Sequence, residues 1–223
     1  MGGKRQFKAK AGGECATVAS LFKAEREPGG LHGDRRIVFK DQDAETKLCA
    51  LSVDHSWDLE EMIQANHAEG VAYELRFKSF KVDVSVRYVA DPIAECSYAI
   101  VSGRSLDETC ALLEEKIAHW SKQELFDDWN NAPHDKAQIL AILRIGVAAP
   151  FDYEESFALT LEQGLVHENS EVREATLAAI GYRDWREFDQ LLGNAATNDP
   201  EERSRNRAAI MLTHRPEAVT EET

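Results

Sequence analysis

The segment from residue 134 to residue 215 repeats, and this repeat decides the fold. Three ten-residue stretches align on their last residues: AQILAILRIG (137–146), VREATLAAIG (172–181) and ERSRNRAAIM (202–211). Their ends are offset by 35 and then 30 residues (146 to 181, 181 to 211), and two more helical patterns, 153–166 and 185–195, lie between them. A repeat of this length predicts stacked helical hairpins, because one hairpin alone does not bury its apolar face.

The middle stretch carries a resemblance to a known family. Residues 169–173 (NSEVR), then Ala175 and residues 178–181 (AAIG), resemble the second helix of a HEAT repeat. In the third stretch Glu202 replaces the Val and Met211 replaces the Gly, and the first stretch lacks the Val-Arg pair. The resemblance implies a HEAT-like helical array over residues 134–215 that binds other macromolecules, and it implies no reaction.

Local capping signals also favour helices in this segment. Asn169 is a residue type that caps the start of a helix, here the one containing Val172. Asp199 precedes Pro200 and lies three residues before Glu202, which predicts a capping box.

The first 122 residues predict an α+β domain. Apolar and polar residues alternate over 71–90 and change parity near 79–81, which predicts a β-hairpin with one buried face. The other predicted elements are strands at 36–40, 47–53 and 96–101, a helix at 57–67 capped by Ser56, and a helix at 106–120. Together they predict an antiparallel sheet with helices on one side.

The predicted organisation is therefore an α+β domain (1–122), a packed connector (123–133), the HEAT-like array (134–215) and a short disordered tail (216–223). Three large aromatic residues, Trp120, Phe126 and Trp129, lie in or beside the connector. We predict that they form the interface between the two halves.

The negative charge of the chain gathers in the array. The net charge is −14, and residues 126–223 hold 9 basic and 19 acidic side chains, which leaves −10 there and −4 in residues 1–125. Such a field repels nucleic-acid phosphates and attracts basic surfaces, so we expect a basic protein partner and no nucleic acid. The candidate protein-binding residues are the clustered carboxylates Asp152, Glu154, Glu155, Glu168, Glu171 and Glu174. The alternative reading of these clusters is a hydrated surface that keeps the chain soluble, with carboxylates favoured near helix N-termini.

No motif for a reaction is present in the sequence. It has no phosphate-binding glycine loop, no GxSxG and no HExxH, and its His and Cys residues lack zinc spacing, so we predict no catalytic residue, cofactor or metal. Two weaker alternatives are the dipeptide Asp54-His55 and a nucleophilic Cys96. No apolar run reaches the ~18 residues of a membrane helix and no signal-peptide core is present, so we expect a cytoplasmic protein without a membrane partner.

These observations favour a non-enzymatic interaction protein. One class that fits is a bacterial immunity or inhibitor protein that masks a basic toxin, because an acidic inhibitor is steered electrostatically onto a basic enzyme. An adaptor or assembly factor would have the same sequence features. The alternative class is a small hydrolase-like enzyme in the α+β half, with the repeats as a docking arm.

Overall fold

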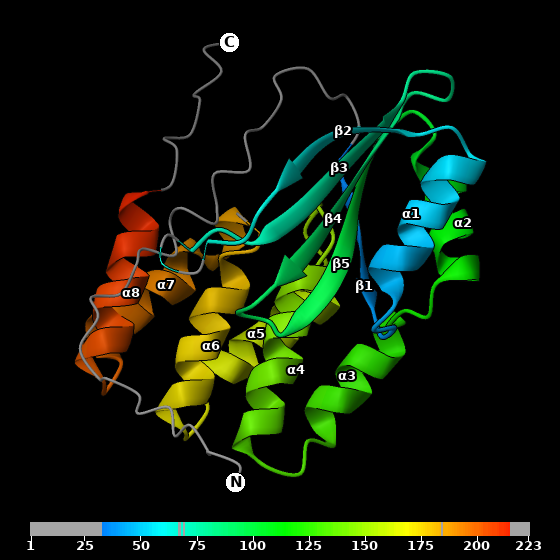
Figure 1. Cartoon of the computed structure of the whole chain (residues 1–223). Helices are drawn as coiled ribbons and strands as arrows, with labels where there is room; N and C mark the ends of the chain where they lie inside the picture. Colours follow the sequence, from blue (N-terminus) through cyan, green and yellow to red (C-terminus); the bar gives the residue numbers. More distant parts are fainter. Residues whose placement is uncertain (1–32, 67, 69, 184, 215–223) are drawn as a thin grey trace, which may run out of the picture.

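The computed structural model describes residues 33–66, 68, 70–183 and 185–214. Within these residues the chain forms a five-stranded antiparallel sheet with two helices, followed by a helical part (Figure 1). This confirms an α+β N-terminal half followed by a mainly helical C-terminal half. The predicted tail at 216–223 lies outside the described residues.

The sheet has the strand order β1-β5-β4-β3-β2, and every neighbouring pair is antiparallel. The strands are β1 (Arg35–Phe39), β2 (Asp58–Ile63), β3 (Tyr73–Ser79), β4 (Val84–Asp91) and β5 (Cys96–Gly103). The predicted hairpin is β3–β4, which closes at the Ser79–Val84 pair. The buried side chains Leu75, Phe77 and Val86 share one face, as the alternation predicted.

Helices α1 (Ala44–Asp54) and α2 (Leu106–Lys116) cover that face. Leu48 of α1 and Leu113 of α2 are fully buried against Phe77 and Val86 of the sheet. The opposite face carries a second cluster, in which Tyr98 and neighbouring strand residues pack against the helical half. The prediction of helices on one side was therefore incomplete, because the array covers part of the other side (Figure 1).

The helical half consists of three helix pairs. They are α3 (Lys122–Asn130) with α4 (Asp135–Ala148), α5 (Glu155–Leu165) with α6 (Ser170–Ile180), and α7 (Asp189–Asn198) with α8 (Glu202–Thr213). A short 3-10 helix, η2 (Arg186–Phe188), precedes α7. The segment expected to be a connector (123–133) thus contains all but the first residue of α3, whose Leu125 and Trp129 are buried in the core of the helical half.

Helix α4 joins the two halves. Its Leu143 and Val147 pack on the sheet, whereas its Ile142 and Ile145 lie in the array core. Gly146 allows α4 and α6 to approach closely, because a Cβ there would lie 2.5 Å from the carbonyl oxygen of Ala179. Close backbone approach of this kind requires glycine.

The predicted aromatic interface was wrong for two of its three residues. Phe126 and Trp129 pack inside the array, where the ring of Phe126 lies 5.1 Å from that of Phe157. Trp120 does contact both the sheet cluster and the array cluster. Small and aliphatic side chains, not aromatic ones, make up most of this interface.

Two elements between β1 and β3 have the opposite secondary structure to the one predicted, with a helix in place of a strand and a strand in place of a helix. The segment 47–53 lies within α1, where Ala44, Leu48 and Leu51 are buried with helical spacing that begins before the stretch taken for a strand. The predicted helix at 57–67 contains β2 instead, and Ser56 is a left-handed turn residue (φ 57°) and not a cap. A bulge at Glu60 explains the error, because it places Leu59 and Met62 on one sheet face at a spacing of three that imitates a helix.

Two predicted helix boundaries also differ. Helix α2 ends at Lys116, and the chain then runs extended beside β1, where the Trp120 N–H donates to the Val38 carbonyl. Helix α8 begins at Glu202 with Glu201 as its N-cap, so the predicted capping box does not form. Asn169 does cap α6 as predicted, accepting from the Glu171 N–H at 2.7 Å.

Candidate protein-interaction site on the helical array

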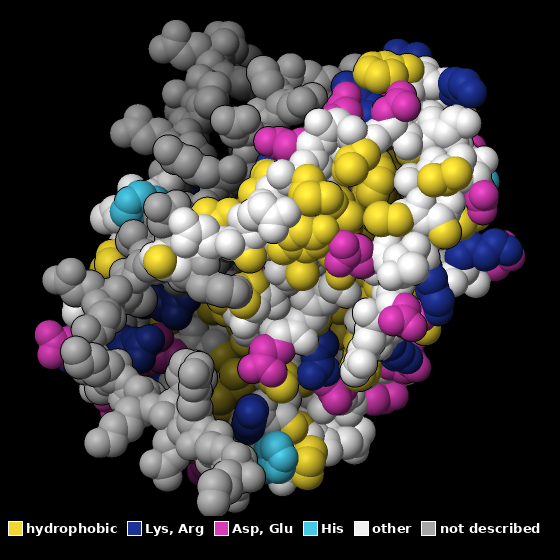
Figure 2. Space-filling model, in the orientation of Figure 1, with side chains coloured by type: hydrophobic (Ala, Val, Ile, Leu, Met, Phe, Trp, Pro, Cys, Tyr) yellow, Lys and Arg dark blue, Asp and Glu magenta, His cyan; other side chains and the backbone are white. Residues whose placement is uncertain are grey.

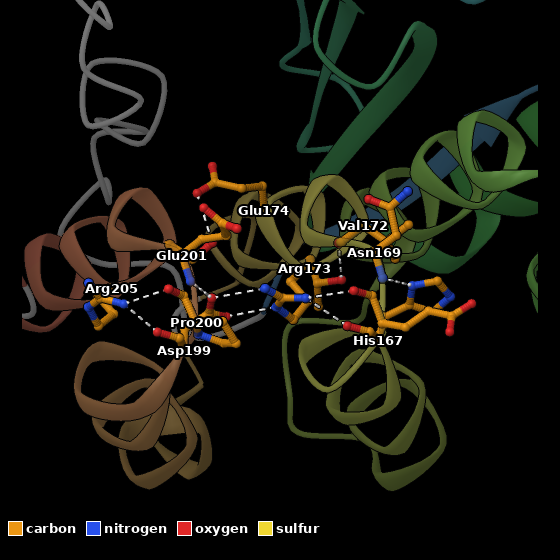
Figure 3. A network of polar contacts seen from close by, with 12 residues as sticks. His167, Asn169, Val172, Arg173, Glu174, Asp199, Pro200, Glu201 and Arg205 are labelled. Carbon is orange, nitrogen blue, oxygen red and sulfur yellow. Dashed lines mark hydrogen bonds and ion pairs between the residues drawn. The ribbon is translucent and has the colours of Figure 1, made fainter.

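Arg173, near the start of α6, joins two successive loops of the array (Figure 3). Its Nη1 donates to the carbonyl oxygens of His167 (2.9 Å) and Glu168 (3.1 Å). Its Nε and Nη2 donate to the two carboxylate oxygens of Asp199, at 2.9 and 3.1 Å. These bonds raise the pKa of Arg173, and they lower the pKa of Asp199 although burial opposes its ionisation. The guanidinium group therefore ties the second helix pair to the third.

Arg205 of α8 repeats part of this arrangement one pair further along. Its Nη1 donates to the carbonyl oxygens of Asp199 (2.6 Å) and Pro200 (2.9 Å), as Arg173 does in the preceding loop (Figure 3). The two arginines are 32 residues apart (173 to 205). The offset of 30 read from the sequence matched Arg173 with Arg203 instead, because it aligned the helix ends and not the loops.

Glu174 does not belong to an exposed acidic face. Its carboxylate lies between α6 and α8, where it accepts from the Ser204 hydroxyl at 3.0 Å and pairs with Arg207 at 3.4 Å and Arg203 at 3.5 Å. Its side chain is only 16% exposed. The structure thus assigns this predicted binding residue to packing between helices.

Glu154 is also engaged within the chain. It is the N-cap residue of α5, it forms an ion pair with Lys122 of α3, and it accepts from the Ser156 hydroxyl. Burial alone would raise the pKa of Glu154, but the hydrogen bonds from Lys122 and Ser156 outweigh burial and lower it. This carboxylate therefore holds the start of α5 against α3.

The remaining four predicted carboxylates are exposed but lie at two places. Asp152 and Glu155 lie at the start of α5, whereas Glu168 and Glu171 lie beyond its end, in the loop before α6 and in the first turn of α6. Helix α5 has 11 residues, so the two pairs are separated by roughly 16 Å along it. They do not form one compact cluster.

The outer face of α5 connects these two places. Glu155, Leu159, Glu162 and Val166 follow the spacing i, i+4, i+7 and i+11, which puts them on one stripe of the helix. Leu159 is 50% exposed and Val166 is 80% exposed. The opposite face buries Phe157 and Leu161 in the core. The sequence predicted a helical pattern at 153–166, and the same periodicity would have revealed this exposed stripe.

An aromatic loop leads into this stripe. Phe151 and Tyr153 flank Asp152 and are 52% and 44% exposed. Trp185 fixes the loop, because its Nε1 donates to the Phe151 carbonyl at 3.1 Å and its ring contacts Tyr153 at 5.3 Å. We define the α5 face as Phe151, Asp152, Tyr153, Glu155, Leu159, Glu162 and Val166.

The sheet half does not bring the two weaker catalytic candidates together. Cys96 lines an open cleft of about 580 Å³ that also borders the loop just before α1, whereas His55 follows the last residue of that helix. Burial raises the pKa of the Cys96 thiol to about 12, which opposes formation of a thiolate. Both cations of this cleft are paired, Lys40 with Glu124 and Arg144 with Asp128. Within the described ranges no three His, Cys, Asp or Glu side chains are placed to hold a metal ion.

No helix in the described part of the chain has the length and apolar character needed to cross a bilayer.

Comparison with known proteins gives no match. No protein-family model matches the sequence, and neither a curated protein nor a solved structure shows significant similarity to it.

Proposed function

We propose that this chain is a non-enzymatic protein-interaction protein of the cytoplasm that binds a basic surface of a partner through the α5 face. The helical half acts as a short HEAT-like array whose outer layer presents this face. The observation that carries the proposal is the alternation of acidic and exposed apolar side chains along the outer stripe of α5. Phe151 and Val166, the first and last residues of the α5 face, are more than half exposed.

The composition of the α5 face suits a protein interface. Exposed apolar side chains in a contiguous patch mark interaction sites, and aromatic residues within such patches often dominate the binding energy. The surrounding carboxylates accelerate encounter with a basic partner through long-range attraction. The Arg173–Asp199 contact supports the proposal of a HEAT-like array, because it links successive helix pairs through their loops.

The partner class that suits these features is a basic enzyme, for which the chain would serve as a bacterial inhibitor or immunity protein. An inhibitor needs a preformed surface and fast association, and the α5 face offers a fixed aromatic loop and an acidic rim. An adaptor that assembles around a basic subunit would use the same contacts. Recovery of the partner from the native host distinguishes the two, since an inhibitor abolishes the activity of the enzyme it binds.

The test compares two matched charge reversals after the host partner has been captured and purified. Glu155→Lys with Glu162→Lys changes the α5 face, and Glu108→Lys with Glu115→Lys places the same change at the same spacing on α2. We expect the first pair to slow association at low salt and to flatten its salt dependence, with a Debye length of roughly 10 Å at 0.1 M salt. The α2 pair should leave the rate close to that of the wild type.

A third variant distinguishes the contribution of apolar contacts from that of long-range charge attraction. Leu159→Ser with Val166→Ser removes apolar contact without changing charge, so it should accelerate dissociation and leave association unchanged. If both α5 variants bind the partner with wild-type rates, the α5 face is not the binding site.

A further inference from the structure

Strand β2 is an open edge of the sheet. In the part of the chain that the structure describes, β2 pairs with β3 on one side and with no strand on the other. Five of its six residues are exposed, and the sixth, Ile63, is half-buried. An edge of this kind presents unpaired backbone N–H and C=O groups, which can accept another strand.

The same edge carries exposed apolar side chains. Leu59 and Met62 pair with Phe77 and Leu75 of β3, so they continue the buried face of the sheet outward. They are nevertheless 50% and 51% exposed. Figure 2 shows hydrophobic side chains gathered over the region of the sheet that Figure 1 labels β2 to β4. Val53, at the end of α1, adds a further exposed apolar side chain close in sequence.

The other face of β2 is acidic. Asp58 and Glu61 lie opposite Lys78 and Arg76 of β3, and Glu61 forms a 2.7 Å ion pair with Arg76. Glu60 occupies the bulge between these two residues. A strand added at this edge would therefore meet apolar side chains on one face and carboxylates on the other.

We propose that β2 accepts an extended segment of a protein partner as a sixth strand, in which apolar and basic residues alternate. The apolar side chains of that segment contact Leu59 and Met62, and its basic side chains lie beside Asp58 and Glu61. Main-chain hydrogen bonds hold the segment, and the alternation sets its register.

Charge excludes the most obvious competing occupant. Pairing of β2 with the β2 strand of a second copy would bring like carboxylates opposite one another, which destabilises a strand pair. The bulge and the acidic residues thus discourage self-association while they admit a basic strand. This surface lies on the sheet half and is independent of the α5 face.

The test uses a synthetic peptide of alternating lysine and valine, long enough to span β2, with blocked ends. Its control is the same peptide with every second backbone amide N-methylated, which keeps charge and side chains but removes donors on one edge. Binding is measured by fluorescence anisotropy, and hydrogen exchange reports the amides of residues 58–63 that point away from β3. We expect the unmodified peptide to bind and to slow exchange in β2, and the methylated peptide to do neither.

Two variants of the full chain complete the test. Leu59→Lys with Met62→Lys changes exposed side chains only, so the chain should fold, and the affinity should fall at least about tenfold. Glu155→Lys with Glu162→Lys on α5 should leave peptide binding unchanged, which separates this proposal from the proposed function. Equal binding of the methylated peptide, or unchanged exchange in β2, would overturn the proposal. Protection in the free chain of the β2 amides that point away from β3 would do the same, because it would mean that another part of the chain or a second copy already occupies the edge.

Discussion

Replacing Arg173 with Met should destabilise the whole chain. The Arg173 side chain is 8% exposed and that of Asp199 is 5% exposed, and four hydrogen bonds connect the guanidinium group to two loops. Removing one partner of a buried, hydrogen-bonded ion pair lowers the free energy of unfolding by about 3–5 kcal/mol. For a chain of this size, a loss of 3 kcal/mol lowers Tm by roughly 6–12 °C.

A double-mutant cycle shows whether the pair itself is responsible. Asp199→Asn keeps an acceptor for the Glu201 N–H but removes the charge. The combined variant should be more stable than the sum of the two single effects predicts, because neither charge is then left unpaired. Arg203→Met is the control, since Arg203 is 76% exposed and its loss should change Tm little.

The pH dependence gives a second check on the same pair. Pairing lowers the pKa of Asp199 below its unfolded value of about 3.9, so the contribution of the pair is complete above that pH. It is lost as the pH falls through the lower folded pKa. The difference in stability between wild type and Arg173→Met should therefore shrink below about pH 4. If Arg173→Met lowers Tm by less than about 2 °C at neutral pH, or if the cycle is strictly additive, the Arg173–Asp199 pair does not stabilise the chain.

Three further outcomes are expected. Gly146→Ala should destabilise the chain by about 1–3 kcal/mol in urea unfolding, because its Cβ would meet the α6 backbone at 2.5 Å, whereas Gly193→Ala, with nothing within 4 Å, should stabilise it by up to about 1 kcal/mol. The hydrogen bond from Lys40, followed by the bonds with Ser121, lowers the pKa of Glu124 to about 2. In Lys40→Met the pKa of Glu124 should rise toward about 4.3, which carbon-detected NMR titration measures. Cys96 should react with iodoacetamide at pH 8 far more slowly than a free thiol, because burial raises its pKa to about 12, and labelling at the free-thiol rate would contradict this.

Periodicity in the sequence predicted the elements that repeat or alternate over a long stretch. The three stretches ending at residues 146, 181 and 211 lie in α4, α6 and α8, and the β3–β4 hairpin follows its parity change. The two wrong predictions, a strand within α1 and a helix over β2, fall where the apolar pattern is short. There a single bulged residue, Glu60, altered the spacing enough to imitate a helix.

The candidate site was predicted only in part, because the charge of a residue does not show whether its side chain points to solvent or between helices. Asp152 is exposed in the loop before α5 and Glu155 is exposed at its start, whereas Glu174 points between α6 and α8 and Glu154 holds α5 against α3. All four are acidic residues and look alike in the sequence, and only the packing of the helices decides which of them are exposed. The exposed Leu159 was not predicted, because the candidate protein-binding residues were chosen by negative charge and Leu159 is apolar.

The double role of α4 limits how this protein can grow during evolution. Repeat arrays lengthen by duplication of a helix pair, and a new pair must fit between existing neighbours or at an end. At the N-terminal end, α4 is fixed by Leu143 and Val147 on the sheet and by Ile142 and Ile145 in the array. A helix pair inserted there would separate α4 from the sheet or from the rest of the helical half, so we expect an added pair to be tolerated only after α6.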